Sequence, residues 1–407
     1  MILIGLYYYV VVISLIIFSS LAYIYYKNTK DLKFSIFFAI GIFYLSKDAF
    51  VARAFELSFL FFILEFYIIE KLVMTGKKKY GFFLIIIGIL LANLHSSVYP
   101  VFFVMFLPYL VSFFIVKLNI KLPKLEIINI SNTKVFFVFF IFTLFTGFCS
   151  TAGTAPYTDM IKVMSGVSKE VITELNHSNM TNNPSIFIAF LVIVISCILT
   201  NKKIKITDIF YIIGFGAMAL YTIRCTGFFW LVSGISINRI LHGYIEGSKI
   251  FNNKYIKSLI FNFLIIIFIL LIIESSINNI EKRFINEEKY PVGASDYIVE
   301  NLNLDKIKIY NHFNFGSYME YRGIKPFIDS RSGVFTTEFN SGCTILEDYI
   351  EVDNDDSKYK KLFDKYKITH CLLFANEEKV KLLENDSNWK LIYQDDSFVL
   401  FEKSLDN

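Results

Sequence analysis

Long apolar runs separated by short polar connections dominate the first two thirds of the chain. Ten such runs cover residues 1–26, 34–46, 55–74, 80–94, 98–116, 135–150, 185–200, 207–222, 226–243 and 258–276. A helix needs about 20 apolar residues to cross the ~30 Å hydrocarbon core of a bilayer. Three of the shorter runs, 34–46, 80–94 and 185–200, would suit shallow or re-entrant segments. The pattern predicts an α-helical polytopic membrane protein with about ten transmembrane helices.

The pattern changes beyond residue 280, where short strand-like and helix-like segments alternate. Strands are expected at residues 306–310, 326–330, 369–374, 389–393 and 397–402, because these segments are short and rich in β-branched and aromatic residues. Helical spacing marks residues 357–366, with Ser357 as the expected N-cap, and residues 377–385. We therefore expect a transmembrane domain over residues 1–280 and a soluble α/β domain over residues 281–407.

Composition and charge support this division. The chain has 407 residues, of which 55% are hydrophobic and 19% charged, and its mean hydropathy is +0.52. That composition is too apolar for a soluble protein of this size. Residues 281–407 contain 17 Lys/Arg against 24 Asp/Glu, whereas the rest of the chain contains 23 against 12. A basic membrane portion is thus followed by an acidic domain.

The distribution of lysine predicts the orientation in the membrane. Every second connection is rich in lysine: residues 27–33, 76–81, 117–126, 201–205 and 248–257. Because Lys and Arg near helix ends favour the cytoplasmic side, these connections are predicted to be cytoplasmic. The protein is then a multi-pass plasma-membrane protein with its C-terminal domain outside the cytoplasm. Attraction to anionic membrane lipid explains the lysines without nucleic acid as a partner.

Because the lysine-rich connections alternate with lysine-poor ones, the lysine-poor connections are predicted to be external, and they contain several polar residues. Arg53, His95 and Arg224 lie there, together with the loop 151–184. Polar groups gathered at one membrane face are expected if that face holds a binding site, although external loops are also simply polar. His95 would suit an acid, a base or a phosphate donor, or it is an ordinary turn residue. Glu65, in the middle of an apolar run, marks either a ligand pathway or a helix-packing carboxyl group.

The sequence excludes several kinds of chemistry. It contains no Walker A loop, G-x-S-x-G, H-E-x-x-H or dinucleotide-binding fingerprint. Its five cysteines show no metal-binding spacing, so no metal-ligating residues are predicted, and no cofactor is certain from the sequence. In the C-terminal domain, Asp329 and Arg331 follow an expected strand. They would suit a binding edge, or they form an ion pair that fixes a turn.

Four stretches of the chain resemble GT-C-type polytopic membrane glycosyltransferases, especially bacterial relatives of the protein mannosyltransferases. They are VARAFELSFLFFILEFYII (51–69), LLANLHSS (90–97), TIRCTGFFWLVSG (222–234) and YNHFNFGSYMEYRGIKPFIDSRSGVF (310–335). In such proteins an arginine begins one helix, an Asn-x-His pattern ends another, a later external arginine follows, and an extracytoplasmic domain trails the membrane part. The resemblance spans most of the chain.

The resemblance implies transfer of a sugar from a polyprenyl-phosphate-linked donor to an extracytoplasmic acceptor, by direct displacement at the anomeric carbon. Arg53, His95 and Arg224 would then bind the phosphate of the donor. Asp159 and Glu170, with Glu174, are the external carboxylates near the membrane, and one of them would be the general base. Membrane lipid and lipid-linked sugar are the expected partners, and the resemblance leaves the divalent-metal requirement open.

The chain also departs from the family pattern. By the lysine argument its first helix starts outside, so the acidic first loop that supplies the family's base has no counterpart. An internal start codon or fragmentary gene model, a protein partner that supplies the loop, or a loss of catalysis would each explain this. The alternative function is therefore a non-catalytic scaffold or partner subunit in cell-envelope assembly, with a transporter as a third hypothesis.

Overall fold

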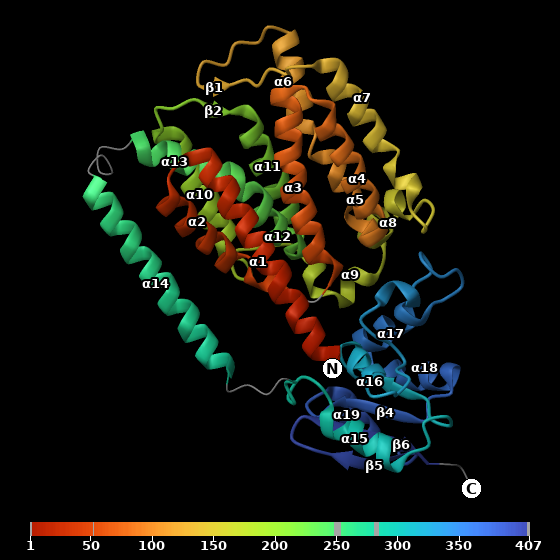
Figure 1. Ribbon diagram of the computed structural model, residues 1–407. Coiled ribbons are helices and arrows are strands. Elements are labelled where there is room, and N and C mark those ends of the chain that lie inside the picture. The colour runs from red at the N-terminus through yellow and green to blue at the C-terminus, as the bar shows by residue number, and fades with distance from the viewer. Residues whose placement is uncertain (1, 52, 248–253, 281–284, 405–407) are drawn as a thin grey trace. The chain divides into compact units, whose positions relative to one another are not determined.

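The computed structural model describes residues 2–51, 53–247, 254–280 and 285–404. It is mostly helical, with few strands (Figure 1). The chain divides into two compact units: unit 1 is Met1–Ile161 with Glu174–Glu274, and unit 2 is Lys162–Thr173 with Ser275–Asn407. A segment inside the first part of the chain thus belongs to the second unit.

Each apolar run predicted from the sequence is helical. The main helices of this part are α1 (Ile2–Thr29), α2 (Leu32–Leu45), α3 (Ala54–Thr75), α4 (Lys78–Leu94), α5 (Tyr99–Val104), α6 (Leu107–Lys117), α7 (Thr133–Leu144), α8 (Ala155–Ser165), α9 (Ser168–Val171), α10 (Pro184–Leu199), α11 (Ile206–Tyr221), α12 (Thr226–Phe228), α13 (Gly234–Gly247) and α14 (Lys254–Ile280). A π-helical turn, Phe229–Ser233, joins α12 to α13, so that the run 226–243 is continuous helix.

Unit 1 is a helical bundle with an aromatic core. Helix α1 packs beside α2 and α3, and α3 packs beside α4 (Figure 1). Phe59, Phe62 and Phe228 are fully buried and stack edge to face where α3 meets α12. The outer surface is also apolar: Ile188, Leu191 and other large side chains of α10 are exposed. An apolar exterior of this kind suits a non-aqueous surrounding.

Two helical stretches of the described chain, Gly5–Thr29 and Ser96–Lys117, are long and apolar enough to cross a membrane. Five shorter apolar helices, of 10 to 17 residues, accompany them: Leu32–Leu45, Thr133–Leu144, Pro184–Leu199, Ile206–Tyr221 and Ser258–Ile267. The two long stretches are consistent with association with a membrane. The polytopic arrangement expected from the sequence stays a prediction.

Unit 2 contains a four-stranded sheet flanked by short helices. Its strands are β3 (Ile309–Asn311), β4 (His370–Phe374), β5 (Trp389–Gln394) and β6 (Phe398–Lys403), in the order β3-β4-β6-β5, with β3 parallel to β4 and the other pairs antiparallel. Its helices are α15 (Val292–Asn301), α16 (Gly316–Tyr321), α17 (Ile345–Asn354), α18 (Tyr359–Tyr366) and α19 (Glu378–Glu384). Both faces of the sheet are covered, because Cys371 and Leu373 of β4 lie in one core cluster and Leu372 lies in another. The α/β pattern expected beyond residue 280 is confirmed.

Two local predictions in unit 2 are wrong. Residues 326–330 form no strand, apart from an isolated bridge between Pro326 and Ile309. The side chain of Asn311 takes up the backbone hydrogen bonds of this segment instead. It accepts from the Phe327 amide at 2.7 Å and donates to the Ile328 carbonyl at 2.9 Å. Ser357 does not cap α18. Its own backbone N–H donates to the side chain of Asp355, which caps the 3₁₀ turn before that helix.

Candidate functional site

A cavity of about 450 Å³ lies in unit 1, between the loop that joins α2 to α3 and the turn that precedes α12. Its polar lining includes Asp48, Arg53, Glu174, Asn183, Arg224 and Thr226. We call it the Arg224 cavity. Two of the three residues that the family resemblance implies for phosphate binding, Arg53 and Arg224, therefore line one hollow although they are far apart in sequence.

Arg224 sits on a short 3₁₀ turn, Ile223–Cys225, between α11 and α12. The backbone of this turn is fixed by hydrogen bonds from the Ile223 amide to the Asn176 carbonyl, at 3.0 Å, and from the Cys225 amide to the Thr222 carbonyl, at 3.1 Å. Its guanidinium group lies 5.0 Å from the centre of the Phe55 ring. Among the described residues, no carboxylate lies within ion-pair distance of Arg224. Burial and the nearby charge of Arg53 lower the pKa of Arg224, although Glu174 acts in the opposite direction.

Arg53 is the N-cap residue of α3 and forms an ion pair across the cavity lining. Its Nη1 atom lies 3.2 Å from each carboxylate oxygen of Glu174. Both side chains are about half exposed, at 55% and 46%. Solvent-exposed pairs of this kind contribute about 0–1 kcal/mol. An incoming anion can therefore replace Glu174 as the partner of Arg53 at little cost.

His95, the third predicted phosphate ligand, stands behind the cavity and is not one of its lining residues. It caps the end of α4, and its Nδ1 atom lies 2.9 Å from the Ser58 hydroxyl. Its ring contacts Phe55 edge to face at a centroid distance of 4.8 Å, and Arg224 contacts the same Phe55 ring. Burial and the charge of Arg224 lower the pKa of His95 to about 4. A neutral His95 that positions Phe55 fits this geometry.

Neither predicted catalytic carboxylate lines the Arg224 cavity. Asp159, on α8, accepts a hydrogen bond from the Ser96 hydroxyl at 2.5 Å. Glu170, on α9, belongs to unit 2. The carboxylates in the lining are Glu174 and Asp48, which lies on the 3₁₀ turn Lys47–Ala49. Asp48 was not among the predicted catalytic residues, and the signal for it is a carboxylate five positions before the arginine that begins α3.

Asp329 and Arg331, the remaining predicted site residues, form an ion pair within a turn of unit 2. Asp329 is buried and accepts from the backbone N–H of Arg331 at 2.8 Å and from its Nε at 3.0 Å. Burial alone would raise the pKa of Asp329, but the hydrogen bonds from Arg331 lower it overall. Arg331 also pairs with Glu320 at 2.9 Å. This arrangement favours the turn-fixing interpretation of the two residues.

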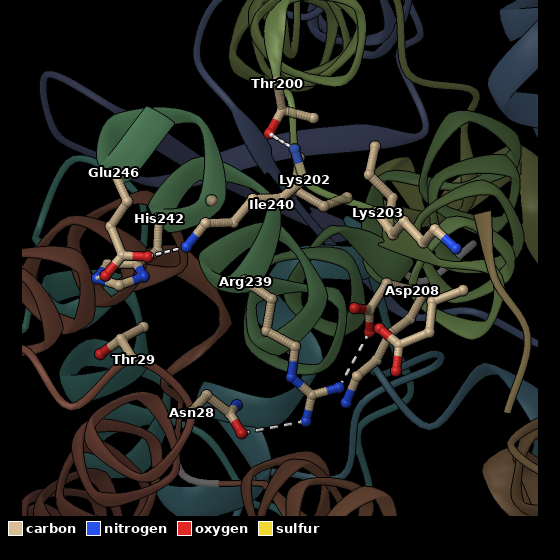
Figure 2. Close-up of a pocket in the computed structure, with 14 residues that line it drawn as sticks. Asn28, Thr29, Thr200, Lys202, Lys203, Asp208, Arg239, Ile240, His242 and Glu246 are labelled. Atoms are coloured by element: carbon tan, nitrogen blue, oxygen red, sulfur yellow. Dashed lines mark hydrogen bonds and ion pairs between the residues drawn. The ribbon is translucent and has the colours of Figure 1, made fainter. Parts of the chain in front are cut away.

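A second polar cavity, of about 280 Å³, was not foreseen from the sequence. Figure 2 shows the side chains around it: the guanidinium of Arg239 faces Asp208 and Asn28, and Lys202 faces Glu246. The two Nη atoms of Arg239 lie 3.1 Å from Asp208 and 2.6 Å from Glu70. We call this the Arg239 cavity. The sequence signal for it is the presence of single charges inside apolar runs, such as Glu70, Asp208 and Arg239.

The two cavities lie at opposite ends of helix α3. Arg53 caps the beginning of α3, and Glu70 lies close to its end. At 1.5 Å per residue these positions are about 25 Å apart. Unit 1 therefore has an arginine site at each end, and the two sites differ in whether the arginine has carboxylate partners.

Comparison of the sequence with protein-family models and with curated proteins gives no match. Among the described residues, no group of three or more His, Cys, Asp or Glu side chains is arranged to hold a metal ion. The function is therefore inferred from the geometry of the Arg224 cavity and its surroundings.

Proposed function

We propose that this chain is a GT-C-like membrane glycosyltransferase, which transfers a sugar from a polyprenyl-phosphate donor to an acceptor outside the cytoplasm. The observation that carries this proposal is the state of Arg224. This arginine is partly buried, lines a cavity of about 450 Å³ and has no carboxylate partner among the described residues. Partial burial of a charge without a partner carries a desolvation cost, and a bound phosphate would supply the charge-assisted hydrogen bonds that it lacks.

An apolar groove beside the Arg224 cavity supports a lipid as the carrier of that phosphate. The groove has a volume of about 350 Å³ and is formed by α2, α10 and the helix that begins at α12. Phe38, Ile188 and Trp230 are among its apolar walls. Leu45 and Ser185 line both the groove and the Arg224 cavity, so the two are neighbours. A cavity with arginines that can bind a phosphate, next to an apolar groove that can hold a lipid chain, matches the chemistry of a prenyl phosphate.

The lining residues suit a direct displacement. The acceptor's hydroxyl oxygen attacks the anomeric carbon, the bond from that carbon to the phosphate oxygen breaks, and the prenyl phosphate leaves with the electron pair. Arg224, with Arg53 once it has left Glu174, stabilises the negative charge on the departing phosphate. The proton of the acceptor hydroxyl passes to the Asp48 carboxylate as general base. Asp48 takes the place first given to Asp159 and Glu170, because it lines the cavity and they do not.

The membrane arrangement in this proposal is multi-pass, with about ten helices and the Arg224 cavity at the outer face. Two observations support it. The exposed surface of α10 is apolar. Two lysine-rich connections, 117–126 and 201–205, meet at the Arg239 end, where strand β1 (Leu125–Glu126) pairs in parallel with β2 (Ile204–Lys205) (Figure 1). A cluster of lysine-rich connections at one end of the bundle fits a cytoplasmic face there.

Binding of a polyprenyl phosphate to the full chain in lipid nanodiscs tests the proposal. Loss of charge-assisted hydrogen bonds in Arg224→Ala should weaken binding about 10- to 100-fold. Lys203→Ala is the matched control, because Lys203 is an exposed cation that lines the other cavity. Undiminished affinity in a folded Arg224→Ala variant would refute the phosphate role.

A non-catalytic protein that only holds the lipid phosphate is the second candidate. The position of Asp159 and Glu170 outside the cavity favours it. Asp48→Asn separates the two functions: the enzyme should lose sugar transfer while it keeps its affinity for the prenyl phosphate. If the unaltered chain binds the lipid but transfers no sugar with any partner present, the scaffold is the better description.

A further inference from the structure

The segment Lys162–Thr173 interrupts unit 1 in sequence but belongs to unit 2. It contains helix α9 (Ser168–Val171) and ends immediately before Glu174, which lines the Arg224 cavity and pairs with Arg53. We call this segment the strap. Its two ends are joined to unit 1 by ordinary peptide bonds, at Ile161 and at Glu174.

The strap is firmly packed within unit 2. Val167, Val171 and Ile172 pack against the hydrophobic core that includes Leu346 and Tyr349 of α17. The ammonium group of Lys162 lies 5.1 Å from the centre of the Phe339 ring. A Cβ atom at Gly166 would be 3.0 Å from Oε1 of Glu338, which shows how closely the backbone approaches its neighbours there. These contacts make the strap a structural part of unit 2.

The residues that follow the strap, 175–178, are held within unit 1 by burial and by backbone hydrogen bonds. Leu175 is buried, and the Asn176 carbonyl accepts from the amide of Ile223, the residue before Arg224. The Ser178 amide donates to the Leu220 carbonyl at 3.0 Å. The residues after the strap thus hold both Glu174 and the turn that carries Arg224.

We propose that the strap couples the position of unit 2 to the Arg224 cavity. Ile172 and Glu174 are two residues apart, and two residues span at most about 7 Å of extended chain. A larger displacement of unit 2 must either pull Ile172 out of its core or separate Glu174 from Arg53. The exposed ion pair is the weaker of these contacts, so it breaks first and frees Arg53.

Coupling of this kind is reciprocal. If a ligand draws Arg53 away from Glu174, the strap and α17 become easier to open. This ligand-driven half of the inference rests on the proposed binding of a prenyl phosphate, whereas the link between the ion pair and unit 2 does not.

Amide hydrogen exchange of the full chain in nanodiscs tests the link without any ligand. The reporters are the amides of Glu170, bonded to the Val167 carbonyl at 3.0 Å, and of Asp348 in α17, bonded to the Thr344 carbonyl at 2.9 Å. Glu174→Gln should raise exchange at both about two- to fivefold, as expected for the loss of an exposed ion pair. Glu246→Gln is the matched control, because Glu246 pairs with Lys202 at similar exposure, and it should change neither reporter.

A six-residue Gly/Ser insertion between Thr173 and Glu174 provides the second arm. In the inserted chain, Glu174→Gln should cause no further rise at Asp348. Unchanged exchange in Glu174→Gln, or a rise that persists after the insertion, would overturn the proposal. Adding a polyprenyl phosphate should raise exchange at Asp348 in the unaltered chain but not in Arg224→Ala. If the lipid alone has no effect, at Asp348 or at the Cys225 amide, the proposed function fails, and Glu174→Gln still decides the coupling.

Discussion

Arg239 and Arg224 stand at opposite ends of the same helical unit and have opposite surroundings. Arg239 donates to Asp208, Glu70 and Asn28, so its charge and its donors are satisfied by the protein. Arg224 contacts the face of Phe55 and lines a cavity. The comparison shows two arginines of one unit, one with carboxylate partners built into the fold and one that lines a cavity and, among the described residues, has no such partner.

The network around Arg239 extends this contrast. Lys205 also contacts Glu70, at 3.3 Å, and Ser236 donates to Asp208 at 2.8 Å. The four charged groups, two of each sign, leave no net charge for an ion to neutralise. The Arg239 cavity is therefore walled by a structural ion network, although it has the size of a small ligand site.

The largest expected effect is on stability, when a substitution removes a carboxylate partner of Arg239. Asp208→Ala leaves a buried guanidinium with one carboxylate fewer, and removal of one member of a buried pair typically costs about 3–5 kcal/mol. We expect the melting temperature of the chain in detergent to fall by roughly 6–20 °C, taking about 2–4 °C per kcal/mol. Lys203→Ala, at the same cavity, should leave it unchanged. A small shift for Asp208→Ala would show that the network is not structural.

The corresponding change at the other end should leave stability unaffected. Arg224→Met keeps much of the packing against Phe55 and removes a charge that no carboxylate among the described residues pairs with. We expect a melting temperature equal to or slightly above that of the unaltered chain, whereas prenyl phosphate binding should fall about 10- to 100-fold. Thermal unfolding and lipid binding of the same preparation measure both. A destabilised Arg224→Met would mean that Arg224, like Arg239, serves the fold.

His95 gives the Arg224 end a pH dependence. Its pKa is lowered to about 4 in the folded chain, against about 6.5 when unfolded, so the unfolded state takes up a proton first as the pH falls. The stability that neutral His95 contributes is complete above pH 6.5 and is lost between pH 6.5 and pH 4. The loss should reach about 2 kcal/mol at pH 5.

His95→Gln checks this expectation, because glutamine can keep a hydrogen bond to Ser58 but does not titrate. Between pH 7 and pH 5 the variant should lose less stability than the unaltered chain in thermal unfolding. Parallel pH profiles for the two proteins would show that His95 is not held neutral next to Arg224.

The helices and the α/β pattern could be read from the sequence because both depend on local periodicity. A run such as 207–222 is apolar enough to be helical whatever it packs against, and β4 to β6 are short segments rich in aliphatic and aromatic residues. The segment 326–330 has the same local character, but the Asn311 side chain, distant in sequence, takes its backbone hydrogen bonds. Where two segments have the same local pattern, tertiary contacts thus decide which of them becomes a strand.

The difference between the two arginines could not be read from the sequence for the same reason. Arg239 is satisfied by Glu70 and Asp208, which come from two other helices. Arg224 and Arg53 were expected at one site from a family resemblance, and the structure brings them to one cavity, but the pairing of Arg53 with Glu174 has no sequence signal. Membership of Lys162–Thr173 in unit 2 likewise depends on contacts with α17, which no spacing indicates.

The smallest expected effect concerns Glu174, the carboxylate at the Arg224 end that is paired with an arginine. Glu174 occupies Arg53, and so it competes with a bound phosphate for that guanidinium. Because the pair is exposed and weak, Glu174→Gln should strengthen prenyl phosphate binding only about two- to fivefold. Glu246→Gln, which breaks a pair of similar exposure at the Arg239 end, should leave the affinity unchanged. Titration of the lipid into both variants measures this. A weaker affinity in Glu174→Gln would mean that Glu174 positions Arg53 for the ligand, and the Arg224 end would then also depend on a built-in partner.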